Sequence, residues 1–187
     1  MANVNVKFDQ RQLKRVQSML RDIPRAMPKV MSRGINNTTK KARTKITREL
    51  SKKTKLTQKT VRSKIRFNKA TYRKWAAVLS ISPRGIPLIQ LKAKQLKSGV
   101  SFTNPVTASR EKLPHAFIAK MPSGHTGVFE RAGTSRLPIK EQYAPGMATL
   151  YSEAPGIVGR IQNETAADLV KNIRTQIDMV LARRRAG

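Results

Sequence analysis

The sequence predicts an α+β protein in which a mostly antiparallel sheet is flanked by N-terminal and C-terminal helices. Apolar residues recur at helical spacing near both ends of the chain, whereas short apolar runs separated by Pro and Gly fill its centre. We expect a single domain over residues 1–187, a length typical of one domain. It would comprise a basic N-terminal helical region (1–55), a β-rich region (63–154) and a C-terminal helix (155–183).

Two amphipathic segments predict helices in the N-terminal region. Apolar residues spaced by three and four predict a short helix over residues 9–23. A second helix should cover residues 28–50, where Lys45 interrupts the apolar face and Gly34 lowers the helix propensity. The apolar arc of this second helix consists of Met27, Met31, Ile35, Thr38, Ala42, Ile46 and Leu50.

The central region predicts one short helix and several strands. Residues 57–62 have the pattern of a capped helix. The polar segment 92–112 should project as an exposed hairpin or loop, mobile or ordered only by a neighbouring molecule. The last helix should begin at Pro155 and carry one apolar stripe from Val158 to Val180. The expected strands cover residues 63–71, 75–82, 86–91 and 99–104, and a hairpin is expected from 116–120 and 127–131.

Positive charge dominates the chain. It contains 39 Lys and Arg against 10 Asp and Glu, which gives a net charge of +29. Residues 30–80 hold 16 of these cations, opposed only by Glu49. A surface so charged repels itself, so we expect a negative partner to neutralise it in use. The absence of cysteine excludes disulfides and Cys-based metal or redox sites.

The chemistry-bearing residues do not form a recognisable catalytic or metal-binding motif. His115 and His125 are ten residues apart, which matches no common zinc-ligand spacing. A hydrolase would have to pair Ser123 with His125, yet residues so close on a turn seldom face each other, and no acid is near in the sequence to orient the imidazole. We therefore predict no enzymatic activity, no metal and no cofactor.

No secretory or membrane-spanning segment is recognisable. The N-terminus lacks the apolar run of a secretory signal, and no stretch reaches the ~18 apolar residues of a spanning helix. We expect a protein that is made in the cytosol and has no membrane partner. A basic helix lying on an anionic membrane surface is a third alternative, ranked low because the apolar faces are needed for a core.

Six cations lie opposite the apolar arc of the 28–50 helix. Burying them without partners would cost too much, so we expect this face to contact water, an acidic protein surface or phosphate. Aromatic residues are scarce nearby, and Phe67 and Trp75 are expected in the core. Contact with double-stranded DNA should therefore involve the backbone and ignore base sequence. The six candidate contact residues are Lys29, Arg33, Lys40, Lys41, Arg43 and Arg48.

Glu130 and Arg131 stand out because acids are rare in this chain. One interpretation is an exposed ion pair at a strand end, worth about 0–1 kcal/mol. The other is that the two residues contact another subunit. The sequence favours the ion pair, and we keep both residues as candidate subunit contacts.

Several short motifs occur along the chain in a fixed order. They are RGINN at 33–37, TKLTQKTVRSKIRFNKAT at 54–71, RGIPLI at 84–89, GVFER at 127–131 and RLPI at 136–139. Their order resembles the minor tail protein Z family of lambda-type phages and prophages, over about residues 25–155. The resemblance implies a virion structural protein that helps to complete the tail at its head-proximal end, without catalytic residues.

We therefore expect a tail completion or neck subunit that acts in tail assembly and head–tail joining as a homo-oligomeric ring. Its partners would be copies of itself and other tail or neck proteins, in the virion after assembly in the host cytoplasm. The alternative is a free basic nucleic-acid-binding protein similar to a ribosomal protein. The turn-rich segment 114–139 favours the assembly subunit, because projecting hairpins provide contacts between subunits.

Overall fold

A computed structural model describes residues 2–6, 14, 18 and 24–185. The helix expected at 9–23 lies outside the described residues, apart from Lys14 and Ser18, which are helical. The chain forms two compact units. The helical unit contains Met1–Ile46, Ile65–Ile81 and Ala154–Gly187, and the strand unit contains Thr47–Lys64 and Ser82–Glu153.

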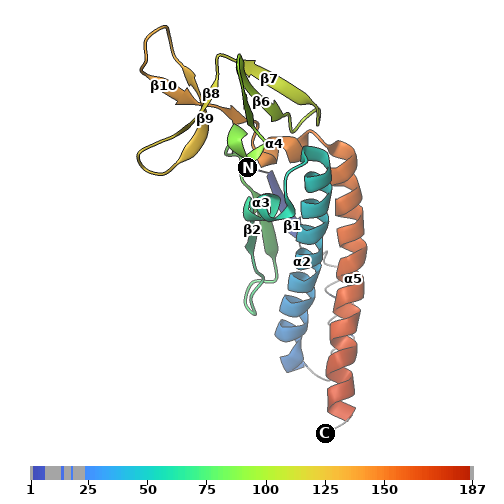
Figure 1. The fold of residues 1–187 in the computed structure, drawn as a ribbon. Coiled ribbons are helices and arrows are strands. Elements are labelled where there is room, and N and C mark those ends of the chain that lie inside the picture. Colours follow the sequence, from blue (N-terminus) through green and yellow to red (C-terminus); the bar gives the residue numbers. More distant parts are fainter. Residues whose placement is uncertain (1, 7–13, 15–17, 19–23, 186–187) are drawn as a thin grey trace. The chain divides into compact units, whose positions relative to one another are not determined.

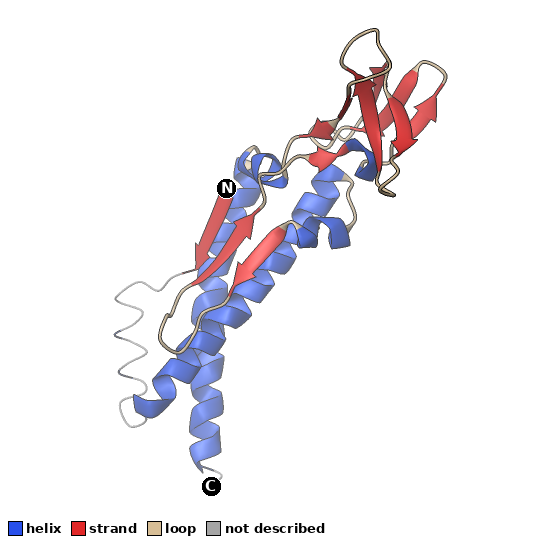
Figure 2. Cartoon of the chain, turned by 90° about the vertical axis from the view of Figure 1, so that its left-hand side faces the viewer, coloured by secondary structure: helices blue, strands red, loops and turns tan. Residues whose placement is uncertain are grey.

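The helical unit combines two long helices with a small sheet (Figures 1 and 2). A 3₁₀ turn η1 (Pro24–Ala26) leads into helix α2 (Met27–Thr54), which runs antiparallel to the C-terminal helix α5 (Pro155–Arg185). The last residues of α2, from Thr47 onward, belong to the strand unit. The sheet is antiparallel in the order β1-β3-β2, with strands β1 (Ala2–Val6), β2 (Ile65–Asn68) and β3 (Ala77–Ile81).

The apolar stripes of both helices form the core of the helical unit. Within this unit the predicted arc of α2 is buried from Met31 to Ile46, and Met27 packs at its edge. Leu50, the last residue of the arc, is also buried but belongs to the strand unit. The stripe of α5 is buried from Ile161 to Ile177. Phe67 and Trp75 pack partly buried against the same core, as expected. The two periodic patterns therefore correctly identified the faces that meet.

The strand unit consists of short antiparallel sheets and two short helices. Its sheet orders are β5-β6-β7, β10-β9-β8 and the two-stranded β11-β4. Its core includes Val61, Leu91, Val100, Val128 and Leu150, all at most 1% exposed. The helices are α3 (Gln58–Ser63) and α4 (Met147–Ser152), with a 3₁₀ turn η2 (Leu88–Gln90). The strands are β4 (Ile86–Pro87), β5 (Lys94–Leu96), β6 (Gly99–Thr103), β7 (Arg110–Pro114), β8 (Phe117–Lys120), β9 (Thr126–Arg131), β10 (Ile139–Glu141) and β11 (Tyr143–Ala144).

The predicted fold class is confirmed, since long helices precede and follow a region of antiparallel strands along the chain. The capped helix after Thr57 and the β8–β9 hairpin are also confirmed. Thr57 Oγ1 accepts the hydrogen bond of the Thr60 amide, which satisfies one donor of the first turn. In the part of the chain that the structure describes, the strands form four small sheets rather than one continuous sheet.

One segment differs from its sequence prediction, and another adopts one of the two predicted alternatives. The strand expected over 86–91 ends at Pro87, and the chain closes a 3₁₀ turn in which the Leu91 amide donates to the Leu88 carbonyl. Segment 92–112 forms β5, β6 and the start of β7, paired with one another. The hairpin alternative is therefore confirmed, with backbone hydrogen bonds inside the segment. Its mobility in the isolated protein stays a prediction.

Candidate basic interface

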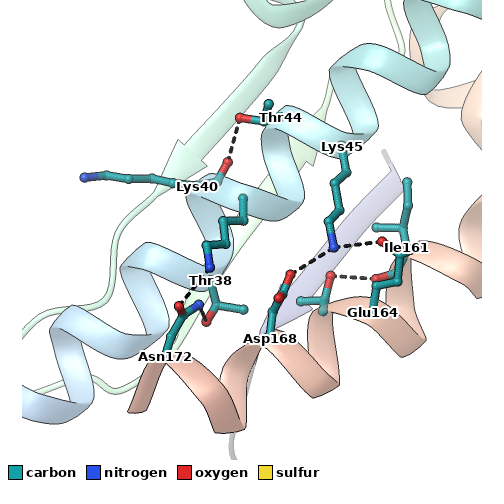
Figure 3. A network of polar contacts seen from close by, with 10 residues as sticks. Thr38, Lys40, Thr44, Lys45, Ile161, Glu164, Asp168 and Asn172 are labelled. Carbon is teal, nitrogen blue, oxygen red and sulfur yellow. Dashed lines mark hydrogen bonds and ion pairs between the residues drawn. The ribbon is translucent and has the colours of Figure 1, made fainter. Parts of the chain in front are cut away.

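Lys45 joins α2 to α5 through two carboxylates (Figure 3). Its Nζ lies 2.7 Å from Glu164 Oε2 and 2.9 Å from Asp168 Oδ2. The hydrogen bond to Glu164 has the largest effect on the pKa of the Lys45 ammonium, which it raises. The hydrogen bond to Asp168 raises it further. Lys45 interrupts the apolar arc of α2 because it faces acids on the neighbouring helix. The positive charge of Lys45 is thus paired with carboxylates inside the helical unit.

Lys41 also reaches α5. Its Nζ donates to Asn172 Oδ1 at 3.1 Å, and Asn172 Nδ2 donates to Thr38 Oγ1 at 2.8 Å. Thr38 is fully buried, so this network continues into the interior between the helices. Lys41 is therefore a structural contact between α2 and α5, although the helical pattern assigned it to the outer cationic face.

Arg43 and Asn36 lie on the side of α2 that faces β2. Arg43 Nη2 donates to the Ile65 carbonyl at 2.7 Å. Asn36 Nδ2 donates to the Ala70 carbonyl at 2.9 Å, while Asn36 Oδ1 accepts from the Ala70 amide at 2.8 Å. The two side chains thus satisfy backbone groups along the outer edge of β2 and its extension, which helps to block pairing with another strand.

The other three predicted cations of the helical unit form a stripe on α2. Lys29, Arg33 and Lys40 are spaced by four and seven residues, so they share one side of the helix. In Figure 3 the Lys40 side chain points away from α5, whereas Lys45 points toward it. Arg48 is exposed on the part of α2 that belongs to the strand unit. We call Lys29, Arg33 and Lys40 the α2 stripe.

Sequence reasoning missed a second group of cations, in the connection between β2 and β3. Lys69, Tyr72, Arg73 and Lys74 are exposed, and Tyr72 retains 61% of its accessible surface. We call residues 69–74 the basic turn. The sequence did contain a sign of this group. Basic residues cluster around Tyr72, and Tyr72 does not belong to any apolar pattern that would place it in the core.

Glu130 and Arg131 end strand β9 in the strand unit. The Arg131 guanidinium lies over the Phe117 ring, 5.4 Å from its centre, in a cation–π contact. Glu130 is opposite Lys140 in the β9–β10 register, and successive strand residues point to opposite faces. Among the described residues Glu130 and Arg131 therefore form no ion pair with each other.

His125 has an acidic partner that the sequence did not reveal. Its Nε2 lies 2.9 Å from Glu141 Oε1, and the Tyr143 hydroxyl donates to Glu141 Oε2. This hydrogen bond raises the pKa of Tyr143. Ser123 is exposed in the preceding turn, and no hydrogen bond joins it to His125 among the described residues. The cluster connects the β8–β9 turn to β10 and β11.

The described residues contain no cluster of three metal-ligating side chains. Within the same part of the chain, none of the helices has the length and apolar character needed to cross a membrane. The candidate interface consists of the α2 stripe and the basic turn on the helical unit, whose cations are exposed except for the half-buried Lys29.

Comparison with known proteins identifies the family. A model of the family described as prophage minor tail protein Z (GPZ) matches residues 11–183. No curated protein and no solved structure shows significant similarity to the chain. The match covers almost the whole sequence, including α2, nearly all of α5, the basic turn and the strands from β2 onward. The chain therefore belongs to the prophage minor tail protein Z family and is a structural protein of the bacteriophage virion tail.

Proposed function

We propose that this chain is a tail completion subunit that assembles into a closed homo-oligomeric ring at the head-proximal end of the tail and takes part in head–tail joining. Its membership of a minor tail protein family supports a place in the tail. The resemblance set out above supports the head-proximal end. A ring requires one subunit to present two different surfaces that meet in the neighbouring copies.

Exposed apolar side chains of the strand unit support the proposal that it contacts other subunits. Leu137 is 68% exposed in the loop between β9 and β10, and Leu96, Val106 and Tyr143 are each more than 40% exposed. We take these four side chains as the candidate contacts with neighbouring subunits, because the centre of a subunit interface is mostly apolar. The net charge of +29 opposes self-association, so assembly should require a partner that neutralises it.

The experiment that tests this proposal locates the chain in the particle. A C-terminal epitope tag on the phage-encoded protein, detected by gold-labelled antibody in negative stain, should mark the junction of head and tail. Cryo-electron microscopy of the same virions should show several copies in a closed ring. Label at the distal tip or along the shaft would contradict the head-proximal position. One isolated copy per virion would contradict the ring.

The alternative function is a free nucleic-acid-binding protein. The observation that favours it is the run of 61 residues from 50 to 110 without any acid, which a virion subunit does not require. The two functions differ in where the protein is found. A free binding protein would be absent from purified virions, whereas a tail subunit should be retained in a fixed copy number after density-gradient purification and a high-salt wash.

A further inference from the structure

We propose that the basic turn, together with the α2 stripe, binds the phosphate backbone of duplex DNA. The inference deepens the proposed function and rests on it for the source of the DNA, which must pass the head-proximal end of a tail. The binding surface itself is argued from the helical unit alone.

The basic turn concentrates positive charge that none of the described acidic residues neutralises. Its cations are Lys69, Arg73 and Lys74, and Arg66 is exposed on the adjoining strand β2. Among the described residues, none of the three turn side chains forms an ion pair or donates a hydrogen bond. Each is thus available to replace a counterion condensed on DNA.

Local hydrogen bonds hold the turn in one conformation. The Thr71 amide donates to the Lys74 carbonyl at 2.9 Å, and the Lys74 amide donates to Thr71 Oγ1 at 3.0 Å. The Trp75 indole donates to the Tyr72 carbonyl at 2.9 Å. The turn is also anchored at Ala70, which is buried in the core and held by Asn36 at both backbone groups. Binding therefore requires little further ordering of the backbone.

The basic turn and the α2 stripe belong to the same side of the helical unit. Asn36 ties Ala70 to α2. At about 100° per residue, the three cations of the α2 stripe lie within roughly 60° of Asn36 around the helix. The surface next to the turn thus carries Lys29, Arg33 and Lys40 as well. Six cations on adjoining elements are enough to contact several phosphates along a DNA backbone.

The composition of this surface favours nucleic acid over an acidic protein. Four of its six cations are lysines, a residue depleted in protein–protein interfaces, whereas nucleic-acid interfaces are strongly positive. It favours a duplex over a single strand because Tyr72 is its one strongly exposed aromatic, and single-strand sites stack successive bases on several rings. We assign the Tyr72 hydroxyl the role of a neutral donor to a phosphate oxygen.

The test measures the affinity of the full-length purified protein for fluorescein-labelled 20-base-pair duplexes of two unrelated sequences, by anisotropy over a series of salt concentrations. Both duplexes should bind equally well. The triple variant Lys69→Gln, Arg73→Gln, Lys74→Gln should flatten the slope of log affinity against log salt by about 2–3 units, at roughly 0.9 per phosphate contact. Circular dichroism should show an unchanged fold, because all three side chains are exposed.

A matched control removes the same charges from the strand unit. Lys112→Gln, Lys120→Gln, Arg136→Gln replaces two lysines and one arginine that are also exposed. It should change the slope by less than about one unit, because these residues make no phosphate contact. Equal slopes for the two triple variants would overturn the proposal and show that net charge alone attracts DNA.

Two further measurements complete the test: duplex binding by the Tyr72→Phe variant, and binding of an acidic polymer by the turn variant. Tyr72→Phe should weaken duplex binding about two- to tenfold at every salt concentration without changing the slope, since the hydroxyl carries no charge. Poly-L-glutamate represents an acidic protein surface. If the turn variant loses poly-L-glutamate binding and keeps its duplex binding, an acidic protein is the partner and the DNA proposal fails. None of these measurements depends on the ring or on its place in the tail.

Discussion

Gly34 of α2 lies directly against Ile173 of α5. A Cβ atom at position 34 would be 2.4 Å from Ile173 Cδ1 and 2.9 Å from Ile173 Cγ1. Both values are below the distance that carbon atoms tolerate, and Ile173 is only 3% exposed. The glycine that lowers the helix propensity of α2 is therefore the residue that lets the two helices approach closely.

Substitution of this glycine should destabilise the protein despite the better helix propensity of alanine. We expect Gly34→Ala to lower the free energy of unfolding by about 1–3 kcal/mol, because the added methyl overpacks the core. Ile173→Val removes the nearest atom, so the cost of Gly34→Ala should be smaller in that background. Urea denaturation of the four proteins in the double-mutant cycle gives the coupling energy. Strict additivity would contradict the contact.

Lys40 and Arg43 belong to the same helix but should respond differently to neutralisation. Arg43→Gln loses the hydrogen bond to the Ile65 carbonyl in a partly buried site, which should cost about 1–3 kcal/mol. Lys40→Gln should change stability by no more than about 0.5 kcal/mol, since its side chain is exposed. Urea denaturation compares the two. A cost for Lys40→Gln that equals the cost for Arg43→Gln would mean that both side chains are structural.

Tyr151 should be replaceable by phenylalanine. It is 4% exposed, and its hydroxyl has no hydrogen-bond partner among the described residues. Tyr151→Phe removes this unsatisfied group, so stability at pH 7 should stay the same or rise by about 1 kcal/mol. Burial raises the pKa of the Tyr151 phenol, so its protonated form is the one that the fold accommodates.

The alkaline side of the stability profile reports on the same phenol. Because the pKa of Tyr151 is higher in the folded state than the ordinary value of 10.0, the wild type should lose stability as the pH rises above that value. Tyr151→Phe should lack this part of the loss. Thermal melts between pH 7 and 11 compare the proteins, with Tyr72→Phe as the exposed control. Identical alkaline losses in wild type and Tyr151→Phe would contradict a buried phenol.

Lys45 should contribute stability that disappears at high pH. The hydrogen bonds to Glu164 and Asp168 raise its pKa above 10.5, so the charged form is favoured in the folded state. Its contribution is then complete below the ordinary pKa of lysine and is lost as the pH rises through the higher folded pKa. We expect Lys45→Gln to cost no more than about 1 kcal/mol at pH 8, because solvent screens this partly exposed pair.

The difference between wild type and Lys45→Gln should therefore shrink between pH 9 and pH 12. Denaturant titrations at several pH values measure it. Lys40→Gln serves as the control, because no described carboxylate lies within hydrogen-bond distance of Lys40. A difference that stays constant over this range would show that Lys45 stabilises the helices through packing of its aliphatic part.

The sequence was most informative where the decisive contacts are local. The period of 3.6 residues identified α2 and α5 and their buried faces, and alternation with turn residues identified the β8–β9 hairpin. Ordered motifs pointed to the family that the comparison then established. Each of these signals depends on neighbours within a few positions of the chain.

Only the tertiary structure decided which cations form contacts within the protein. Lys41, Arg43 and Lys45 have the same residue types as the α2 stripe, yet they contact Asn172, the Ile65 carbonyl and Glu164. Similarly, Glu141 reaches His125 from 16 positions away along the chain. A helical period shows which side of a helix a residue occupies, but it contains no information on what packs beside that side. That depends on the approach of distant segments, which at Gly34 and Ile173 is set by the absence of a single methyl group.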